Sequence, residues 1–183
     1  MADFTIIYYP PESVCPPAMR LSRAAALLLD REPEEDEALY ETKRGVGGKP
    51  YFVNMPGLHF SLSHSGGHWM CAFGSEPVGL DLQRKQTCDR ARISRRFFHP
   101  EEDDYLRRTG YRDFFCVWAA KESFVKLTGQ GVGDEMRLFS VAGEAGIRPS
   151  VEGMRLFFPP FDEDFALCLC AREIGQVKIL YGR

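Results

Sequence analysis

Alternating or continuous runs of apolar and β-branched residues predict strands in both halves of the chain. In the clearest run, Val78–Gln83, period-two spacing places Val78, Leu80 and Leu82 on one face and Gly79, Asp81 and Gln83 on the other. Further strands are expected at residues 4–9, 59–62, 69–73, 136–141, 151–158, 165–171 and 176–181. Because Asp is depleted in strands, Asp81 stands out on a face that we expect to lie opposite the core.

Three segments have the spacing and end signals of helices. Residues 18–30 are rich in Ala and Leu and follow two prolines. A second helix should begin at Pro100 and end near Gly110, and a longer one should cover 112–128 and stop at Gly129. The order of these elements predicts an α+β protein in which each half forms a small unit.

The longest predicted helix carries charged residues inside an apolar run, Trp118 to Lys126. At about 100° per residue, Glu122 and Lys126 share a face, as in an ordinary surface ion pair. Lys121, however, falls within the apolar stripe, where an ammonium group needs a partner or an exit to solvent. This segment is therefore a candidate for either a structural ion pair or a functional site.

Composition limits the possible functions of this 183-residue chain. A formal net charge of −3 argues against general binding to nucleic acid. Six cysteines without a C-x-x-C pair indicate a reducing compartment, so we expect a cytoplasmic protein. The sequence contains no apolar run approaching the roughly 20 residues that span a bilayer, so we expect no membrane association. We also expect a monomer.

One segment departs from the acidic average. Residues 84–96 contain six basic residues against the single acid Asp89: Arg84, Lys85, Arg90, Arg92, Arg95 and Arg96. Such a run is either a solvated surface or a docking patch for an anionic partner.

Four further signals suit a site for Mg²⁺ and a polyphosphate. They are a lysine in a glycine loop (Gly48-Lys49-Pro50), a histidine among hydroxyls (Ser63-His64-Ser65), the strand carboxylate Asp81, and the helix pair Glu122 and Lys126. Mg²⁺ typically takes one or two protein carboxylates and completes its shell with water and phosphate oxygens.

Together and in this order, these motifs resemble the 4′-phosphopantetheinyl transferases of the Sfp type, whose pattern is G-K-P, S-H-S, G-[IVL]-D-[IVL]-E and W-x-x-K-E-[AS]-x-x-K. The resemblance implies an α+β fold of two pseudo-symmetric lobes, here 1–78 and 79–183, with coenzyme A in the cleft between them. It also implies transfer of 4′-phosphopantetheine from coenzyme A to a serine of an acyl or peptidyl carrier protein, with release of adenosine 3′,5′-bisphosphate.

The resemblance assigns roles to the acidic and basic residues of the helix and the strand. Asp81 and Glu122 match the Mg²⁺ ligands, and Glu122 is also a candidate for deprotonating the carrier serine. Lys126 matches the lysine near the displaced phosphate. Where the family usually has a second strand glutamate, this chain has Gln83. The metal site is then expected to contain two carboxylates, with water or the Gln83 oxygen as a third ligand.

The remaining matches concern the nucleotide. His64 corresponds to the histidine near the 3′-phosphate, and Lys49 and Ser63 correspond to positions around the nucleotide. Lys121 also matches the pattern and is assigned to cofactor binding. The short, proline-rich N-terminus leaves Arg20 and Arg23 as further candidates for the 3′-phosphate.

Two other functions fit some of the same residues. A Mg²⁺-dependent nucleotide phosphoesterase would use the metal but usually needs more carboxylates or histidines. A non-catalytic module that binds coenzyme A or a carrier protein would need neither the carboxylates nor Lys126.

Overall fold

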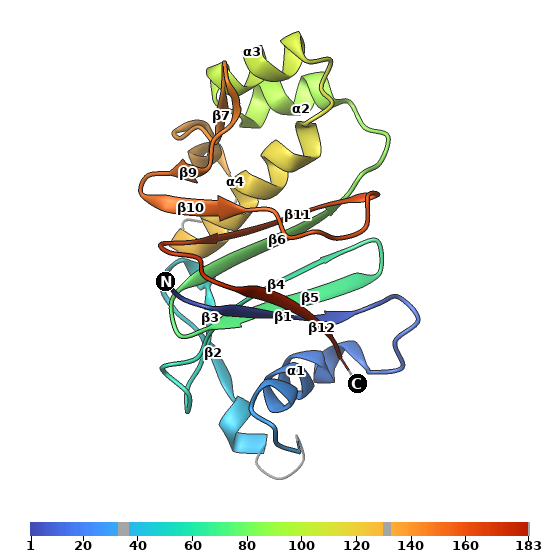
Figure 1. Cartoon of the computed structure of the whole chain (residues 1–183), viewed down its shortest axis with the longest axis vertical. Coiled ribbons are helices and arrows are strands. Elements are labelled where there is room, and N and C mark those ends of the chain that lie inside the picture. The colour runs from blue at the N-terminus through green and yellow to red at the C-terminus, as the bar shows by residue number, and fades with distance from the viewer. Residues whose placement is uncertain (33–36, 130–132, 183) are drawn as a thin grey trace.

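The computed structural model describes the chain apart from residues 33–36, 130–132 and 183. Two four-stranded sheets lie at its centre (Figure 1). The first sheet has the order β12 (Val177–Tyr181), β1 (Phe4–Tyr9), β5 (His68–Gly74) and β4 (His59–Ser65). In this sheet β1 runs parallel to β12 and antiparallel to β5, which is antiparallel to β4.

The second sheet is antiparallel throughout. Its order is β6 (Val78–Arg84), β11 (Phe165–Ala171), β10 (Met154–Phe157) and β9 (Ser150–Val151). The register pairs Asp81 of β6 with Cys168 of β11. Since β6 is an edge strand of this sheet and β4 is an edge strand of the first, the two sheets can meet along these edges.

Helices and short hairpins complete the fold. The α-helices are α1 (Arg20–Leu28), α2 (Arg90–Phe97), α3 (Pro100–Arg108) and α4 (Phe114–Thr128), and the two hairpins are β2 (Thr42–Arg44) with β3 (Pro50–Phe52) and β7 (Ala142–Gly143) with β8 (Gly146–Ile147). Short 3₁₀ turns cover Pro17–Met19, Glu37–Tyr40, Val46–Gly48 and Asp134–Arg137. Within the described part of the chain, no helix is both long and apolar enough to cross a membrane.

The elements stack as four layers: α1, the first sheet, the second sheet and α4 (Figure 1). Successive residues of β1, such as Ile6 and Ile7, point to opposite faces of the first sheet, and both are fully buried. Ile6 joins the core between the sheets, and Ile7 joins the core beneath α1. Thus the strands β1, β5 and β11, at the centres of the two sheets, are buried on two faces. This corrects the expectation for β6, because α4 also covers the face that carries Asp81.

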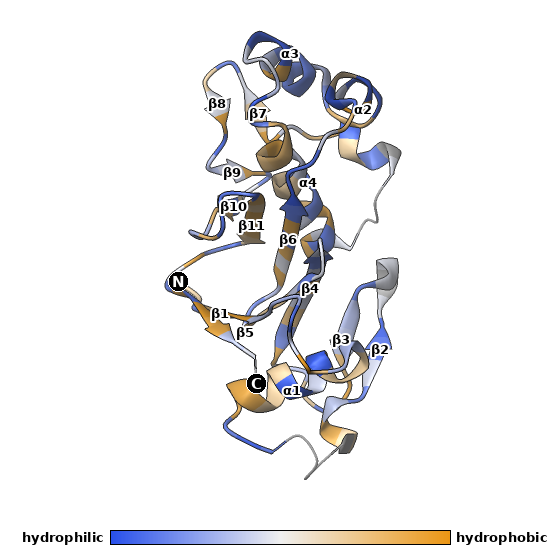
Figure 2. Cartoon of the chain, turned by 90° about the vertical axis from the view of Figure 1, so that its right-hand side faces the viewer, coloured by the Kyte–Doolittle hydropathy of each residue, from blue (hydrophilic) through white to orange (hydrophobic). Residues whose placement is uncertain are grey.

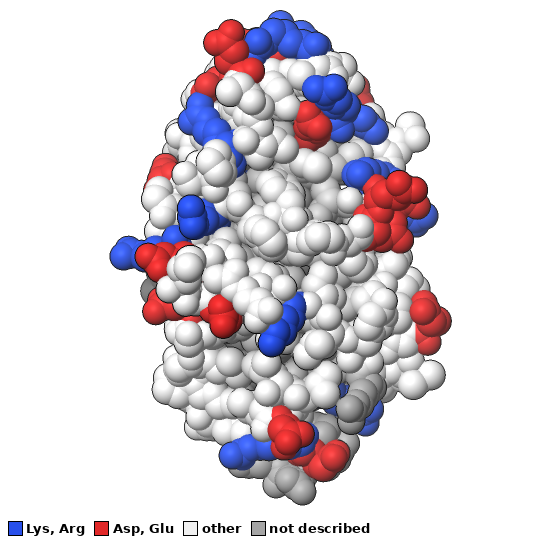
Figure 3. All heavy atoms as spheres, viewed as in Figure 1, with Lys and Arg blue, Asp and Glu red and all other residues white. Residues whose placement is uncertain are grey.

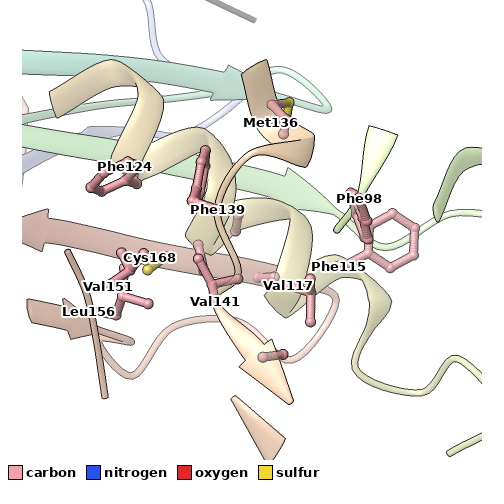
Figure 4. Packing of buried hydrophobic residues seen from close by; sticks show 14 of the residues in the cluster. Phe98, Phe115, Val117, Phe124, Met136, Phe139, Val141, Val151, Leu156 and Cys168 are labelled. Carbon is pink, nitrogen blue, oxygen red and sulfur yellow. The ribbon is translucent and has the colours of Figure 1, made fainter. Parts of the chain in front are cut away.

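The third core lies between α4 and the second sheet, and it shows why one predicted strand is wrong. Residues 136–141 form a 3₁₀ turn followed by irregular backbone. Met136, Phe139 and Val141 are buried in this core (Figure 4). Their side chains pack toward α4 at a spacing that is not that of a strand, so the apolar content of the segment reflects burial alone.

The sequence pattern also missed the short strands β2, β3, β7 and β8 and the helix α2. This helix begins after Asp89, whose side chain accepts a hydrogen bond from the backbone N–H of Arg92 at 3.0 Å. It is mostly hydrophilic, as is α3 (Figure 2). Basic and acidic side chains gather over this end of the molecule (Figure 3).

The last strand crosses the boundary expected near residue 79. Val177–Tyr181 adds to the edge of the first sheet beside β1, with Ile179 opposite Ile6. The C-terminal strand therefore pairs with the N-terminal one, and the two halves of the chain are tied together by sheet hydrogen bonds.

Candidate active site

A ladder of serine hydroxyls joins the two sheets where β4 and β6 meet. Each of three alternate serines of β4 accepts a hydrogen bond from a backbone N–H of β6: Leu80 to Ser61 at 2.9 Å, Leu82 to Ser63 at 3.0 Å, and Arg84 to Ser65 at 2.9 Å. These side chains satisfy edge N–H groups that no strand pairs. The ladder fixes β6 beside β4 and brings Ser63 next to Asp81.

Asp81 is the centre of a buried polar cluster. The residue is 2% exposed, and its carboxylate accepts hydrogen bonds from three side chains. Oδ1 accepts from Ser63 Oγ at 2.9 Å and from Lys126 Nζ at 2.7 Å, and Oδ2 accepts from the amide of Gln83 at 2.9 Å. Lys126 Nζ also lies 3.1 Å from Ser63 Oγ. The structure thus brings together four of the residues expected to form the site.

Glu122 lies one turn before Lys126 on α4 and is 7% exposed. Burial raises the pKa of its carboxyl to about 7, with a further rise from the Asp81 carboxylate and an opposing effect from Lys126. Two carboxyl groups close enough to influence each other, one of them holding a proton near neutral pH, form a natural cation site.

The close approach of α4 to β6 depends on Gly79. A Cβ atom at this position would lie 1.8 Å from the carbonyl oxygen of Ser123 and 2.7 Å from the backbone nitrogen of Leu127. Any side chain would push α4 away from the strand. Gly79 therefore sets the distance between the strand that carries Asp81 and the helix that carries Glu122.

A pocket of about 260 Å³ lies beside this cluster. Lys126 and Val125 of α4, Phe60 and Leu62 of β4, and Lys49 are among the residues that line it. Apolar walls with a few charged groups at one end are typical of sites for small organic ligands. The pocket could therefore hold a phosphorylated ligand with its charged end at Lys126.

Lys49 is only partly available to such a ligand. Its ammonium donates to the carbonyl of Val78 at 2.8 Å and to that of Leu127 at 3.2 Å. Burial lowers the pKa of this ammonium to about 8. Lys49 thus connects the β2–β3 hairpin to the start of β6 and to the end of α4, and one of its three N–H donors is left for another partner.

The structure does not bring Lys121 to the cluster. This side chain is fully buried, and its ammonium lies 2.7 Å from Glu102 Oε2 and 2.9 Å from the carbonyl oxygen of Phe139. Burial lowers the pKa of Lys121 and raises the pKa of Glu102, while their mutual attraction opposes both shifts. Its burial gives Lys121 no access to a ligand in the pocket.

The other candidates for nucleotide binding lie elsewhere. His64 is exposed near the end of β4, next to Ser63. Arg20 and Arg23 lie on α1, which covers the opposite face of the first sheet from β6. The Arg20 guanidinium donates to the carbonyl of Cys15 at 3.1 Å and lies over the ring of Tyr9. Neither arginine is part of the Asp81 cluster.

The donor set fits Mg²⁺ in type and number. Asp81 and Glu122 offer carboxylate oxygens and Gln83 offers an amide oxygen once its side chain turns, since its amide nitrogen faces Asp81 as placed. Among the described residues, no group of three or more His, Cys, Asp or Glu gathers as a metal site. The remaining positions of a bound ion would then belong to water and ligand oxygens.

Two features of the site were not predicted from the sequence. The serine ladder was signalled by the period-two spacing of Ser61, Ser63 and Ser65, which places all three on one face of β4. Glu102 as the partner of Lys121 had no local signal, because the two residues lie on different helices.

Comparison with known proteins identifies the family. A family model described as the 4′-phosphopantetheinyl transferase superfamily matches residues 77–174, more than half of the chain. This range contains β6, α4 and both carboxylates of the cluster. The chain belongs to the 4′-phosphopantetheinyl transferase superfamily, and its resemblance to the Sfp type is confirmed.

Several curated relatives carry the name of this enzyme. A Bacillus subtilis 4′-phosphopantetheinyl transferase is 36% identical over 138 residues, which cover 68% of this chain and 59% of the relative. The 4′-phosphopantetheinyl transferase Sfp of Bacillus subtilis (strain 168) is 37% identical over 100 residues, 51% of this chain and 43% of Sfp. HetI from Nostoc is 34% identical over 110 residues, 55% of this chain and 45% of HetI. The chain spans about half the length of the curated relatives it matches.

Proposed function

We propose that this protein transfers 4′-phosphopantetheine from coenzyme A to a serine of an apo acyl or peptidyl carrier protein in a Mg²⁺-dependent reaction. Adenosine 3′,5′-bisphosphate is the second product. The observation that carries the proposal is the cluster of Asp81, Ser63 and Lys126, with Glu122 beside it, at the edge of a pocket. Membership of the 4′-phosphopantetheinyl transferase superfamily also supports this reaction.

Asp81 and Glu122 would hold the metal ion, with Gln83 or water as a third ligand. The ion supplies positive charge to the pyrophosphate of coenzyme A. The serine ladder and Gly79 hold Asp81 and α4 at a fixed separation. This preorganisation means that little rearrangement is needed when a substrate binds.

Lys126 is the side chain placed to act on the leaving group. Its ammonium is bonded to Asp81 and Ser63 and also lines the pocket. It can neutralise the charge that develops on the departing phosphate or donate a proton to it. Glu122 is also a candidate for accepting the proton of the carrier serine. Its raised pKa of about 7 belongs to the metal-free protein, and a bound cation would lower it, which favours the carboxylate form that a base requires.

Within this proposal, coenzyme A lies in a cleft between two pseudo-symmetric α+β lobes, 1–78 and 79–183. Support comes from the pocket, whose walls include β4 from one half and α4 from the other. His64, Lys49 and Ser63 would surround the nucleotide, and Arg20 and Arg23 remain candidates for the 3′-phosphate. Lys121 would affect cofactor binding only indirectly, because its buried ammonium does not reach the pocket. The unpaired state of all six cysteines supports a cytoplasmic location.

The carrier protein would dock on the basic segment 84–96. Arg92 and Arg96 are exposed on α2, whereas Arg90 is half-buried and donates to the carbonyl of Tyr111 at 3.1 Å. Replacing Arg92 and Arg96 by Glu should therefore raise KM for the carrier and weaken its salt dependence, while KM for coenzyme A stays constant. An unchanged KM for the carrier would place docking on another surface.

A mass-spectrometric assay tests the central proposal. The protein is incubated with coenzyme A, Mg²⁺ and a panel of apo carrier proteins, and the carrier should gain the mass of one phosphopantetheine group. Hydrolysis of coenzyme A without modification of any carrier would indicate a phosphoesterase instead. Binding without either reaction would indicate a non-catalytic module.

A further inference from the structure

A fully buried ion pair lies behind the candidate site. Glu102 of α3 and Lys121 of α4 are both 0% exposed, with 2.7 Å between Oε2 and Nζ. Lys121 is adjacent in sequence to Glu122, but the two side chains leave the helix about 100° apart. Glu102 therefore meets Lys121 on one side of α4, while Glu122 and Lys126 lie on another side that faces β6.

Glu102 connects three segments of the chain. Its Oε2 also accepts from the backbone N–H of His99 at 2.9 Å, which closes a capping box at the start of α3. Its Oε1 accepts from the backbone N–H of Val141 at 2.6 Å. Lys121 in turn donates to the carbonyl of Phe139 at 2.9 Å, and its ammonium lies over the ring of the same residue at 4.1 Å.

These contacts are directional and restrict the rotation of α4 about its axis. Apolar packing around the helix tolerates small rotations, because dispersion contacts have no preferred direction. An ammonium group that is hydrogen-bonded to fixed partners on two segments resists such rotations. Gly79 sets the separation of α4 from β6, and Lys126 bonds the helix to Asp81 only through a long, flexible side chain, so a small rotation of α4 would still move Glu122 relative to Asp81.

We infer that Glu102 and Lys121 are positioning residues, which fix the rotation of α4 so that the Glu122 carboxylate faces Asp81. This inference rests on the proposed function for its consequence in catalysis, but its geometry is independent of the reaction. Stability alone gives a poor reason for the pair, because a buried ion pair is often no more stabilising than apolar residues of similar volume. An orienting role explains why charges occupy this position.

The test compares a neutral pair with a matched control. In the double variant Glu102→Gln/Lys121→Met both charges are absent, so no unpaired charge remains buried. In the control, Glu101→Gln/Arg148→Met, a half-exposed ion pair between α3 and the segment after β8 is removed in the same half of the molecule. Glu102→Asp keeps the charge but shortens the side chain, and it replaces the double variant if that variant does not fold.

Two readouts separate positioning from stability. Binding of Mn²⁺, measured by electron paramagnetic resonance in the presence of coenzyme A, should weaken by about 10- to 100-fold in the double variant, as it does when outer partners of metal ligands are removed. At saturating Mg²⁺ and a temperature where the variant is fully folded, kcat should fall by about 100-fold, while KM for coenzyme A stays near the wild-type value. The Mn²⁺ affinity and kcat of Glu102→Asp should lie between those of the wild type and the double variant.

The control should retain wild-type Mn²⁺ affinity and kcat even if its Tm falls. Wild-type Mn²⁺ affinity in the folded double variant, or an equal loss in the Glu101→Gln/Arg148→Met control, would overturn the inference. Because Mn²⁺ binding needs no group transfer, a wild-type protein that binds the metal but modifies no carrier would count against the proposed function and leave the positioning role to be judged by the metal affinity alone.

Discussion

The contact between Gly79 and α4 gives the strongest single prediction. A Cβ at position 79 would lie 1.8 Å from the Ser123 carbonyl oxygen, about 1.6 Å short of the 3.4 Å at which ordinary contact begins. The three atoms nearest to the added methyl group all belong to the backbone of α4, so no side chain can turn away to make room. In Gly79→Ala, α4 must therefore move as a unit by more than 1 Å or the strand must bend.

Two effects of Gly79→Ala can be estimated. Forcing an extra methyl group into a close-packed core costs about 1–3 kcal/mol, and a contact with rigid backbone belongs at the upper end of that range. A displacement of about 1 Å between positioned groups costs about 100-fold in rate. We expect the variant to lose stability and to lose kcat well beyond what its unfolded fraction explains.

Thermal unfolding and the carrier-modification assay, run at a temperature where the variant stays folded, check this prediction. The matched control is Gly57→Ala, since a Cβ at Gly57 meets no atom within 4 Å. That control should behave as wild type. A Gly79→Ala protein with wild-type Tm and kcat would show that α4 does not approach β6 as closely as described.

Three further predictions concern single side chains of the site. Gln83→Glu should lower the Mg²⁺ concentration that gives half-maximal rate, because it adds a third carboxylate; an equal or higher requirement would move residue 83 away from the metal. His64→Ala should weaken the binding of coenzyme A more than that of dephospho-coenzyme A, which lacks the 3′-phosphate. Equal losses of affinity for the two ligands would exclude a contact between His64 and the 3′-phosphate. Because the pKa of Glu122 is raised from 4.5 to about 7, the metal-free protein should lose stability as pH rises from 4.5 to 7, where the unfolded chain releases this proton and the folded one retains it. Glu122→Gln should remove that loss in denaturant titrations, and an unchanged pH profile would contradict the shift.

The sequence predicted the long apolar elements and missed the short or strongly hydrophilic ones. β6 has apolar residues at a clear spacing of two, α4 is a long apolar run that ends at Gly129, and both lie where expected. α2 was missed because Ile93 and Phe97 give it only a narrow apolar stripe among arginines. The segment 136–141 was misread because its apolar residues suggested a strand, and nothing local reveals that they pack beneath α4.

For the site, the sequence motifs indicated the acidic groups and Lys126 but not the partners of the other lysines. Lys49 and Lys121 stand in motifs that suggested ligand contacts, yet both ammonium groups are bonded within the fold. Their partners are backbone carbonyls and a carboxylate on another helix, and these come together only when the sheets and α4 have packed. Such contacts depend on tertiary structure, so a pattern along one segment cannot predict them.

Because Lys49 and Lys121 are bonded elsewhere in the fold, Lys126 determines the positive charge of the site. Of the three lysines in the motifs, Lys126 alone is bonded to side chains of the cluster, where its single positive charge faces Asp81. Glu122 adds up to one negative charge, depending on whether it holds its proton. The side chains of the cluster therefore offer no net positive charge to a pyrophosphate, and the two carboxylates would repel it. A divalent cation between these carboxylates reverses that balance, so in the proposed reaction metal and coenzyme A should bind cooperatively, each raising the affinity of the other.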